Sequence, residues 1–273
     1  MGKILPFPWY GGKYTHTSFV YEHLPQTEYY AEPFCGSAVI LLNKPQSSVE
    51  TINDLNSEIV NFFEVLQTDT DELLHRIEYT PYSREIFEKA KHKQHDDEIE
   101  RALYFLVRTT QSYNATGSSW AKATTVSRRG KSQKVALWEH RKQYIEETAE
   151  RLNEVQIENS DAAYVCEKYD DAETTFYCDP PYPPDCRKST DAYAHEMGED
   201  EHREFAKTAR SLDGYVAISS YESSLLNELY DDWNIIYGDE KTLAGKGTGD
   251  RTEVLYTNYD PETVTTVTDV QQS

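Results

Sequence analysis

A short segment near position 180 carries residue types that could bind and activate an amino group. Residues 178–182 read Cys-Asp-Pro-Pro-Tyr and follow a Thr- and aromatic-rich run typical of a buried strand. The two prolines fix the backbone and donate no N–H, so the carbonyls of Asp179 and Pro180 are held in one arrangement. The Asp179 carboxylate and the Tyr182 ring would converge at a strand's carboxyl end, where open α/β sheets bind ligands. This chemistry suits a flat base that carries an amino group; a plain strand-to-loop turn is the simpler alternative.

The elements that must position this segment alternate between strands and helices. Strands are expected where β-branched and aromatic runs are bounded by turn residues. They cover about residues 29–32, then 47–52, 155–157, 163–166, 174–177, 214–219, 233–237 and 252–258. Apolar residues recur at helical spacing through 56–66, 69–105 and 137–153, whereas 108–136 has little periodicity and predicts an extended loop or β-ribbon. The pattern indicates one α/β domain interrupted by an insert.

Two further segments favour a ligand pocket in the first half of the chain. Residues 32–38 (Glu-Pro-Phe-Cys-Gly-Ser-Ala) resemble a Rossmann-like first βα turn with one glycine instead of three. Asp54 lies 18 positions after Gly36, near the spacing at which such folds place an acid on ribose hydroxyls. Asp54 could equally cap the helix that begins near Asn56, and both interpretations stay open. The aromatic and glycine-rich residues 9–13 (Trp-Tyr-Gly-Gly-Lys) lack Walker A spacing, so no nucleoside triphosphate is implied.

The charge distribution is uneven. The chain carries 48 acidic residues and 27 Lys or Arg residues, which gives a net charge of −21. An acidic surface either serves solubility alone or indicates a halophilic protein from a cytoplasm with molar salt, and we favour the second interpretation. Residues 101–138 nevertheless contain seven Lys or Arg residues and no Asp or Glu, which predicts a surface that binds a polyanion. The alternative is a basic face that docks on the protein's own acidic surface. The candidate contacts to phosphates and base edges are Arg108, Gln111, Asn114, Lys122, Arg128 and Arg129.

Composition argues against several other classes of protein. No apolar run is long enough to span a membrane, and the N-terminus lacks a signal-peptide pattern. The four cysteines form no CxxC pair and no zinc-like spacing with the histidines. We therefore expect reduced thiols, a cytoplasmic location and no metal.

In this order, the four segments at 9–13, 32–38, 53–56 (Asn-Asp-Leu-Asn) and 179–182 resemble the Dam-type, alpha-group DNA adenine methyltransferases. The resemblance covers about residues 6–258. It implies a Rossmann-like S-adenosylmethionine-dependent methyltransferase fold, in which a mixed seven-stranded sheet carries helices on both faces and an inserted, mainly helical DNA-recognition domain. Residues 1–66 and 156–260 would then form the catalytic domain, 67–155 the recognition insert and 261–273 a flexible tail.

The resemblance also implies roles for individual residues. The methyl donor, S-adenosylmethionine, would contact Trp9, Lys13, Phe34, Gly36, Asp54 and Asp179. The catalytic set would be Asp179, Pro180, Pro181 and Tyr182, acting on the N6 amino group of an adenine flipped out of duplex DNA. Hydrogen bonds from that amino group to the Asp179 carboxylate and the Pro180 carbonyl would free its lone pair to attack the methyl group, while Tyr182 stacks on the base.

Alternative functions and partners follow from the same pocket. A cytosine-N4 methyltransferase needs similar chemistry, a catalytically silent DNA-binding module would use only the insert, and methylation of a protein glutamine also uses a Pro-Pro-Tyr corner. Methylation of a cytosine ring carbon is disfavoured because the chain has no Pro-Cys dipeptide to supply the nucleophile. The expected substrate is double-stranded DNA. The resemblance allows a cognate restriction endonuclease as partner, and we expect a monomer or weak dimer. The glycine-rich loop at 244–251 falls where the family has a hairpin near the target base.

Overall fold

The chain forms two compact units in the computed structural model, which describes residues 3–9, 11–92, 95–124, 130, 132–186, 195–238 and 252–272. The helical unit comprises Met1–Tyr14, Gly36–Asn43 and Asn56–Ile157. The sheet unit comprises Thr15–Cys35, Lys44–Leu55 and Glu158–Ser273. Residues 158–273 therefore belong to the sheet unit, whereas the chain before them is divided between the two units.

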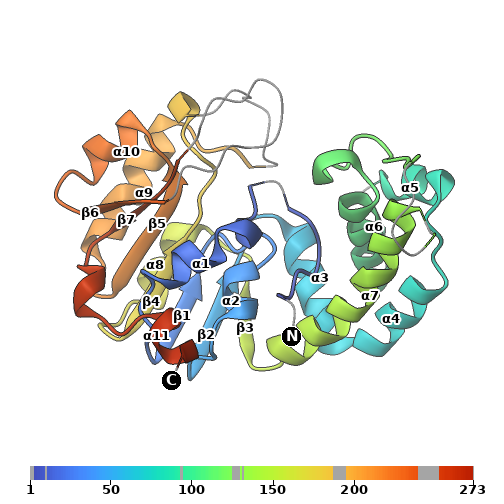
Figure 1. Ribbon diagram of the computed structural model, residues 1–273, viewed down its shortest axis with the longest axis horizontal. Coiled ribbons are helices and arrows are strands. Elements are labelled where there is room, and N and C mark those ends of the chain that lie inside the picture. Colours follow the sequence, from blue (N-terminus) through green and yellow to red (C-terminus); the bar gives the residue numbers. More distant parts are fainter. Residues whose placement is uncertain are drawn as a thin grey trace. The chain divides into compact units, whose positions relative to one another are not determined.

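A mixed seven-stranded sheet has the strand order β3-β2-β1-β4-β5-β7-β6 (Figure 1). Its strands are β1 (Tyr29–Glu32), β2 (Val49–Asn53), β3 (Val155–Glu158), β4 (Thr174–Cys178), β5 (Tyr215–Tyr221), β6 (Asn234–Tyr237) and β7 (Glu253–Thr257). β1 pairs in parallel with both β2 and β4, and β4 pairs in parallel with β5. β7 runs antiparallel between β5 and β6. The expected mixed seven-stranded α/β sheet is confirmed.

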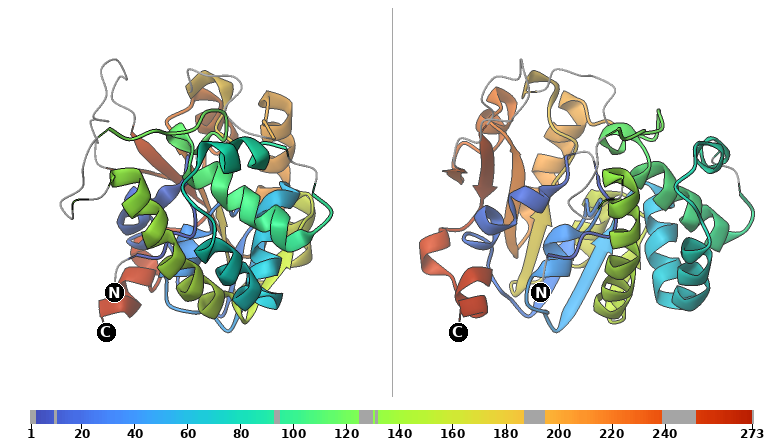
Figure 2. Two further views of the ribbon diagram at one scale, coloured as in Figure 1. Left: turned by 90° about the vertical axis from the view of Figure 1, so that its right-hand side faces the viewer. Right: turned by 45° about the vertical axis from the view of Figure 1, so that its right-hand side comes forward.

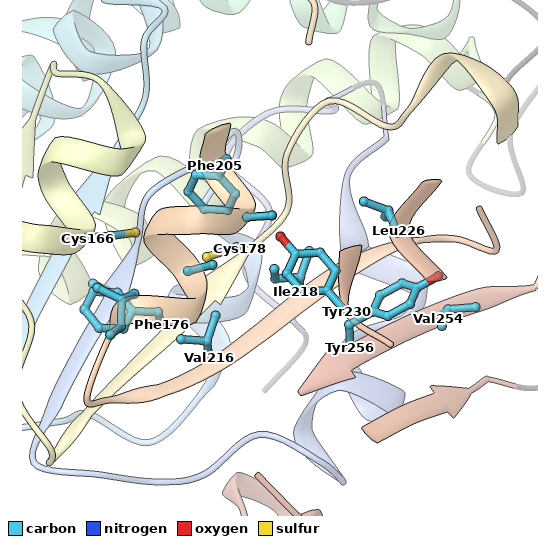
Figure 3. Close-up of a cluster of buried hydrophobic side chains, with 14 residues drawn as sticks. Cys166, Phe176, Cys178, Phe205, Val216, Ile218, Leu226, Tyr230, Val254 and Tyr256 are labelled. Atoms are coloured by element: carbon cyan, nitrogen blue, oxygen red, sulfur yellow. The ribbon is translucent and has the colours of Figure 1, made fainter. Parts of the chain in front are cut away.

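Short helices complete the sheet unit. They are α1 (Thr17–Tyr21), α8 (Ala162–Lys168), α9 (Glu199–Ser211), α10 (Ser224–Leu229) and α11 (Val267–Gln272), with the 3₁₀ turns η3 (Pro184–Cys186) and η4 (Pro261–Thr263). One face of the sheet buries an apolar cluster in which Phe176 and Ile218 meet Phe205 of α9 and Leu226 of α10 (Figure 3). Because side chains alternate along a strand, the neighbours of Phe176 and Ile218 point to the opposite face. The sheet therefore has one apolar face and one that can hold polar groups.

Residues 162–168 form helix α8 and not the strand expected at 163–166. The apolar run Ala-Ala-Tyr-Val-Cys fits either element by composition. The Asp161 carboxylate decides the outcome, because it accepts hydrogen bonds from the backbone N–H groups of Ala163 and Tyr164 at 2.9 and 3.3 Å. This N-cap satisfies two donors that a strand would have directed to a neighbour.

The C-terminal residues 261–272 are ordered, in contrast to the expected flexible tail. Their first turn, η4, is capped by Asp260, and α11 contributes the buried Val267. The backbone N–H of Val267 donates to the Leu24 carbonyl at 2.9 Å, and that of Gln26 donates to Thr265 at 3.0 Å. Backbone pairing with residues 24–26 therefore ties this polar segment to the sheet unit.

Helices dominate the helical unit, and α3 to α7 pack side by side in it (cyan to green in Figure 2). They are α2 (Val39–Asn43), α3 (Ser57–Thr68), α4 (Thr70–Glu78), α5 (Arg84–Ala90), α6 (Glu98–Thr110) and α7 (Gln133–Leu152), with the 3₁₀ turns η1 (Lys13–Thr15), at the border with the sheet unit, and η2 (Tyr113–Ala115). Phe7 lies at the centre, with its ring centroid 5.2 Å from Phe62 and 4.9 Å from Phe105. The bounds of this mainly helical unit differ from those of the expected insert at 67–155, since it also includes Met1–Tyr14 and Gly36–Asn43 and its long segment runs from Asn56 to Ile157. Helix α6 also continues to Thr110, into the region expected as loop or β-ribbon.

Candidate functional site

The residues expected to do chemistry lie at the carboxyl ends of adjacent parallel strands. Asp179 follows β4, Glu32 ends β1 and Asp54 follows β2. From β1 the chain passes to β2 on one side, while β4 occupies the other side, so the strand order reverses between β1 and β4. Open α/β sheets bind ligands at such a switch point. The sequence-predicted Asp54 and Asp179 are therefore brought to one edge of the sheet.

The Asp-Pro-Pro-Tyr segment is held in place by the tyrosine at its end. Tyr182 is 5% exposed, and its hydroxyl donates a hydrogen bond to the carboxylate of Glu253 at 2.9 Å. Its ring meets the ring of Tyr221 edge to face, with centroids 4.8 Å apart. Asp179 itself is half-buried between the buried Cys178 and Pro180, directly after the end of β4. Glu253 was not anticipated, because a single acid at the start of a strand gives no motif.

The loop after this segment is fixed by Asp185. Its carboxylate accepts hydrogen bonds from the hydroxyls of Ser223 at 2.9 Å and Ser224 at 2.8 Å, and from the Leu225 N–H at 3.3 Å, at the N-terminus of α10. Partial burial favours the neutral acid, but the hydrogen bonds from Ser224 and Ser223 outweigh it and lower the pKa of Asp185. An ionised Asp185 therefore anchors the loop to helix α10.

The segment after β1 is tied to the end of β2. The side-chain amide of Asn53 donates to the Pro33 carbonyl at 2.8 Å, and the Cys35 N–H donates to the Asn53 carbonyl at 2.9 Å. Burial, followed by the charges of Asp54 and Glu32, raises the pKa of the Cys35 thiol well above its usual value. The carboxylates of Asp54 and Glu32 therefore both lie near Cys35 at this edge of the sheet.

The structure decides how the helix after β2 is capped. The side-chain oxygen of Asn56 accepts a hydrogen bond from the Glu58 N–H at 3.0 Å, which makes Asn56 the N-cap of α3. The capping alternative for Asp54 is therefore wrong. The Asp54 carbonyl accepts a hydrogen bond from Asn159 at 2.7 Å, and its half-buried side chain carries the carboxylate that acts on Cys35. Phe34, a predicted donor contact, packs on Phe205 with ring centroids 5.1 Å apart.

In the helical unit, Trp9 and Gly36 lie in direct contact. Gly36 has φ of +49°, and a Cβ at this position would lie 2.8 Å from Trp9 Cδ1. Ala38, two residues later, also adopts a positive φ of 50°, a conformation that costs an alanine free energy. Lys13 is 2% exposed, and its ammonium donates to the Gly11 carbonyl at 3.3 Å. Strained backbone and a buried cation are typical of functional loops.

Two of the predicted DNA contacts are buried inside the helical unit. Arg108 is 6% exposed, pairs with Glu58 and donates to the Ala90 carbonyl at 2.8 Å. Burial lowers the pKa of its guanidinium, and the charge of Glu58 opposes this shift. Gln111 is fully buried, and its side chain accepts a hydrogen bond from the Ser83 N–H at 3.2 Å. Both side chains are occupied within the protein, so their geometry argues for structural roles and not for DNA contact.

Asn114 and Lys122 are exposed, in agreement with a surface role. They belong to a closed loop, residues 112–122, in which the Tyr113 N–H donates to the Ser119 carbonyl at 3.1 Å. The Tyr113 hydroxyl also donates to the Lys122 carbonyl at 3.1 Å. Asn114 has φ of 52° and the following Ala115 has φ of 58°, which turns the chain sharply at the loop tip. We call this segment the 112–122 loop.

An exposed arginine outside the acid-free window lies beside this loop. The guanidinium of Arg84 stacks on Trp120, with its carbon 4.8 Å from the ring centroid, and Tyr82 packs on the same indole at 5.5 Å. Arg84 was missed because it precedes the 101–138 window by 17 residues. Only the fold brings it next to Trp120. The predicted contacts Arg128 and Arg129 and the 244–251 loop lie outside the described residues.

Metal-binding clusters and membrane-spanning helices are both absent from the part of the chain that the structure describes. Among those residues, no three His, Cys, Asp or Glu side chains gather in a way that could hold a metal ion. Over the same ranges, no helix combines the length and apolar character needed to cross a membrane.

Comparison with known proteins gives consistent matches over most of the chain. A family model described as D12 class N6 adenine-specific DNA methyltransferase matches residues 9–243. A DNA adenine methylase of Vibrio cholerae is 24% identical, with 88% of this chain and 90% of the relative covered. A DNA adenine methylase of Escherichia coli is 25% identical over 94% of this chain and 95% of the relative. The Type II methyltransferase M.MjaIII of Methanocaldococcus jannaschii is 26% identical, with 85% and 90% covered.

Proposed function

The chain belongs to the D12 class N6 adenine-specific DNA methyltransferases, and from this membership we propose how its residues carry out the reaction. The enzyme methylates the N6 amino group of adenine in DNA. The observation that carries our assignment of the catalytic residues is the position of Asp179. It follows β4 at the switch point of the sheet and precedes a tyrosine whose ring is fixed by Glu253.

We propose that Asp179 and Pro180 accept hydrogen bonds from the adenine amino group. The lone pair of that nitrogen is delocalised into the ring, which makes it a poor nucleophile. Two acceptors that favour a tetrahedral nitrogen would free the lone pair, and the geometry of prolines 180 and 181 keeps the acceptors in place. Tyr182 would stack on the base after it leaves the duplex. The acceleration would come from position and electrostatics, without a covalent intermediate on the protein.

The proposed methyl donor is S-adenosylmethionine, which supplies an electrophilic methyl group for in-line displacement. It carries positive charge, and the carboxylates of Glu32 and Asp54, whose charges act on Cys35, provide a negative potential that fits it. Asp54 would hold the ribose hydroxyls, and Phe34 would shape the pocket. Trp9, Lys13 and Gly36 are proposed donor contacts on the strength of the family resemblance alone.

For DNA we propose that the helical unit supplies the recognition surface. The exposed Asn114 and Lys122 present the 112–122 loop to the duplex, and Arg84 adds a guanidinium whose orientation is fixed by Trp120. Such a stacked guanidinium can contact a phosphate with little loss of side-chain entropy. Arg108 and Gln111 are left out of this surface because they are buried. Arg128 and Arg129 stay predictions.

Methyl transfer from labelled S-adenosylmethionine to unmethylated DNA in concentrated KCl, with identification of the product nucleosides, tests the proposal. The wild-type enzyme should form N6-methyladenine, and Asp179→Ala should lose activity by at least about a hundredfold. Asp213→Ala, a surface carboxylate of the same unit, serves as the control and should retain activity. Methylcytosine as product would favour the cytosine-N4 alternative. DNA binding without transfer would favour the silent module. We also propose a cytoplasmic location.

A further inference from the structure

Glu253 is a buried carboxylate that the proposed reaction does not use. It is the first residue of β7, pairs in register with Tyr221 of β5 and is 3% exposed. Its carboxylate accepts hydrogen bonds from the hydroxyl of Tyr182 at 2.9 Å and from the hydroxyl of Ser219 at 2.6 Å. Two hydroxyl groups from different parts of the chain thus converge on one acid.

This carboxylate lies on the polar face of the sheet. Val254 and Tyr256 of β7 enter the apolar cluster on the other face (Figure 3). Because successive side chains alternate, Glu253 points away from that cluster. Ser219 likewise follows Ile218, which belongs to the cluster. A buried carboxylate costs folding free energy that an apolar side chain would not cost. The presence of an acid here is therefore better explained by the groups that it orients than by stability.

The group that Glu253 orients is the ring of Tyr182. Prolines 180 and 181 restrict the backbone that leads to Tyr182, the Tyr221 ring makes a T-shaped contact with its ring, and Glu253 holds the hydroxyl at the far end. Ser219 adds a second hydrogen bond that fixes the carboxylate itself. The two ends of the ring are thereby held in place, and the contact with Tyr221 opposes rotation between them. Because the ring is already ordered, a base that stacks on it would not have to immobilise the Tyr182 side chain.

We infer that Glu253 is a positioning residue for the target base, acting through the Tyr182 hydroxyl. The inference rests on the proposed function, in which Tyr182 stacks on the flipped adenine. Ser219 follows Ile218, which pairs with Cys178, the residue before Asp179. Glu253 therefore contacts both Tyr182 and the strand that neighbours β4.

A double-mutant cycle between Glu253→Ala and Tyr182→Phe tests the inference on the full-length enzyme. Each single variant should lower kcat by about tenfold, in line with the loss of one hydrogen bond to a charged group, and leave the KM for S-adenosylmethionine unchanged. The double variant should be no slower than either single variant, because both remove the same contact. Glu253→Gln keeps an acceptor oxygen and should recover most of the activity.

Binding to a duplex with 2-aminopurine at the target position gives a readout that does not depend on turnover. Stacking on Tyr182 quenches the flipped base, so Glu253→Ala should raise its fluorescence relative to the wild type. The control is Glu222→Gln, which removes the charge from an exposed acid that pairs with the exposed Tyr237 at 3.5 Å. This variant should match the wild type in both kcat and fluorescence.

Two results would overturn the inference while the proposed function stands. One is wild-type kcat and wild-type fluorescence in Glu253→Ala, and the other is a double variant about a hundredfold slower than wild type, as expected for independent effects. If Glu253→Ala does not fold, Tyr182→Phe carries the test alone, and wild-type kcat together with wild-type fluorescence in that variant would overturn the inference. A wild-type enzyme that transfers no methyl group to DNA would instead overturn the proposed function, and the inference with it.

Discussion

Gly36 leaves no room for a side chain against Trp9, since a Cβ there would stand 2.8 Å from the indole Cδ1. The Gly36 backbone also has φ of +49°, a region that side chains disfavour. Sterics and conformation therefore both select glycine at this position. The contact fixes the Trp9 indole beside the proposed donor-binding loop.

Gly36→Ala should weaken S-adenosylmethionine binding and lower thermal stability. The positive φ alone costs about 1–3 kcal/mol, and the clash with Trp9 adds to it. The matched control is Gly130→Ala, because Gly130 has φ of +76° and a Cβ there would have no atom within 4 Å. Calorimetric titration with the donor and thermal unfolding of both variants measure the difference. Equal effects of the two substitutions would contradict a role for the Trp9 contact.

Arg108→Ala should destabilise the protein without altering the electrostatics of DNA binding. It leaves the Glu58 carboxylate without its buried partner, which costs about 3 kcal/mol in the free energy of unfolding. The slope of log K for DNA against log salt should stay at the wild-type value, because the guanidinium faces the interior. Denaturant unfolding and DNA binding at several KCl concentrations give the two quantities. A clear fall in the slope would restore Arg108 as a phosphate contact.

Lys122→Ala and Arg84→Ala should show the opposite pattern. Each removes an exposed cation, so we expect stability within about 0.5 kcal/mol of the wild type. Each should also reduce the salt slope by about one if it contacts a phosphate. The control is Lys207→Ala, which removes an exposed lysine of the sheet unit. An unchanged slope in both variants would place the DNA surface elsewhere.

Substitutions of Asp54 and Asn56 should have different effects, because we propose that Asp54 binds the methyl donor whereas Asn56 caps a helix. Asn56→Ala removes the N-cap of α3 and should cost about 1 kcal/mol of stability. Asp54→Asn leaves the cap intact and should raise the KM for S-adenosylmethionine by about tenfold with little change in Tm, as expected for one hydrogen bond to a charged group. Kinetics with varied donor concentration, together with thermal unfolding, distinguish the two. A drop in Tm without a change in KM for Asp54→Asn would argue against the ribose role.

Asp185 should give stability that disappears in acid. Its pKa is lower in the folded protein, so its contribution is complete above the pKa of an unfolded aspartate, about 4, and is lost as pH falls through the folded value. Asp185→Asn should therefore lower Tm at neutral pH, by the equivalent of about 1 kcal/mol or less because the group is largely exposed. The difference from the wild type should shrink as the pH falls below about 4. A constant difference across this range would contradict the ionised cap.

Thermal stability should rise with KCl. With a net charge of −21, self-repulsion opposes folding in dilute buffer, and salt screens it. Unfolding scans from about 0.1 M to about 2 M KCl measure the effect, since the Debye length falls to about 3 Å at 1 M. Full stability in dilute buffer would remove the halophile hypothesis.

The sequence predicted the positions of the strand ends well because local chemistry specifies them. The buried run that ends at Cys178 and the prolines after it leave few alternatives for the backbone. The α8 helix was missed because Ala162–Lys168 is apolar enough for either element, and only the Asp161 cap discriminates. Composition also suggested a flexible C-terminal segment. Backbone hydrogen bonds to residues 24–26 hold this segment, and they depend on tertiary structure that composition does not reveal.

Local sequence patterns could not predict the roles of residues whose contacts lie far away in the sequence. Arg108 lies in an acid-free, basic stretch and is of a residue type that often contacts DNA. Only the packing of α6 on α3 shows that it pairs with Glu58. Glu253 and Tyr182 are separated by 71 positions, so no motif connects them. Sequence patterns therefore pointed to the proposed reacting segment, while the residues that contact it could be found only from the fold.

The pairing of β1 with β4 sets the order in which the chain can fold. Tyr29 lies opposite Thr174, 145 positions later, so the two central strands meet only after all the intervening chain has been made. Helices α3 to α7 fall within that interval and make mostly local contacts, which form fast, whereas long-range strand pairing is slow. During synthesis, the helices should therefore fold first, and the catalytic edge should form last. Until then the edge of β1 that receives β4 is unpaired, so we expect nascent chains shorter than about 174 residues to be more prone to aggregation than the complete chain.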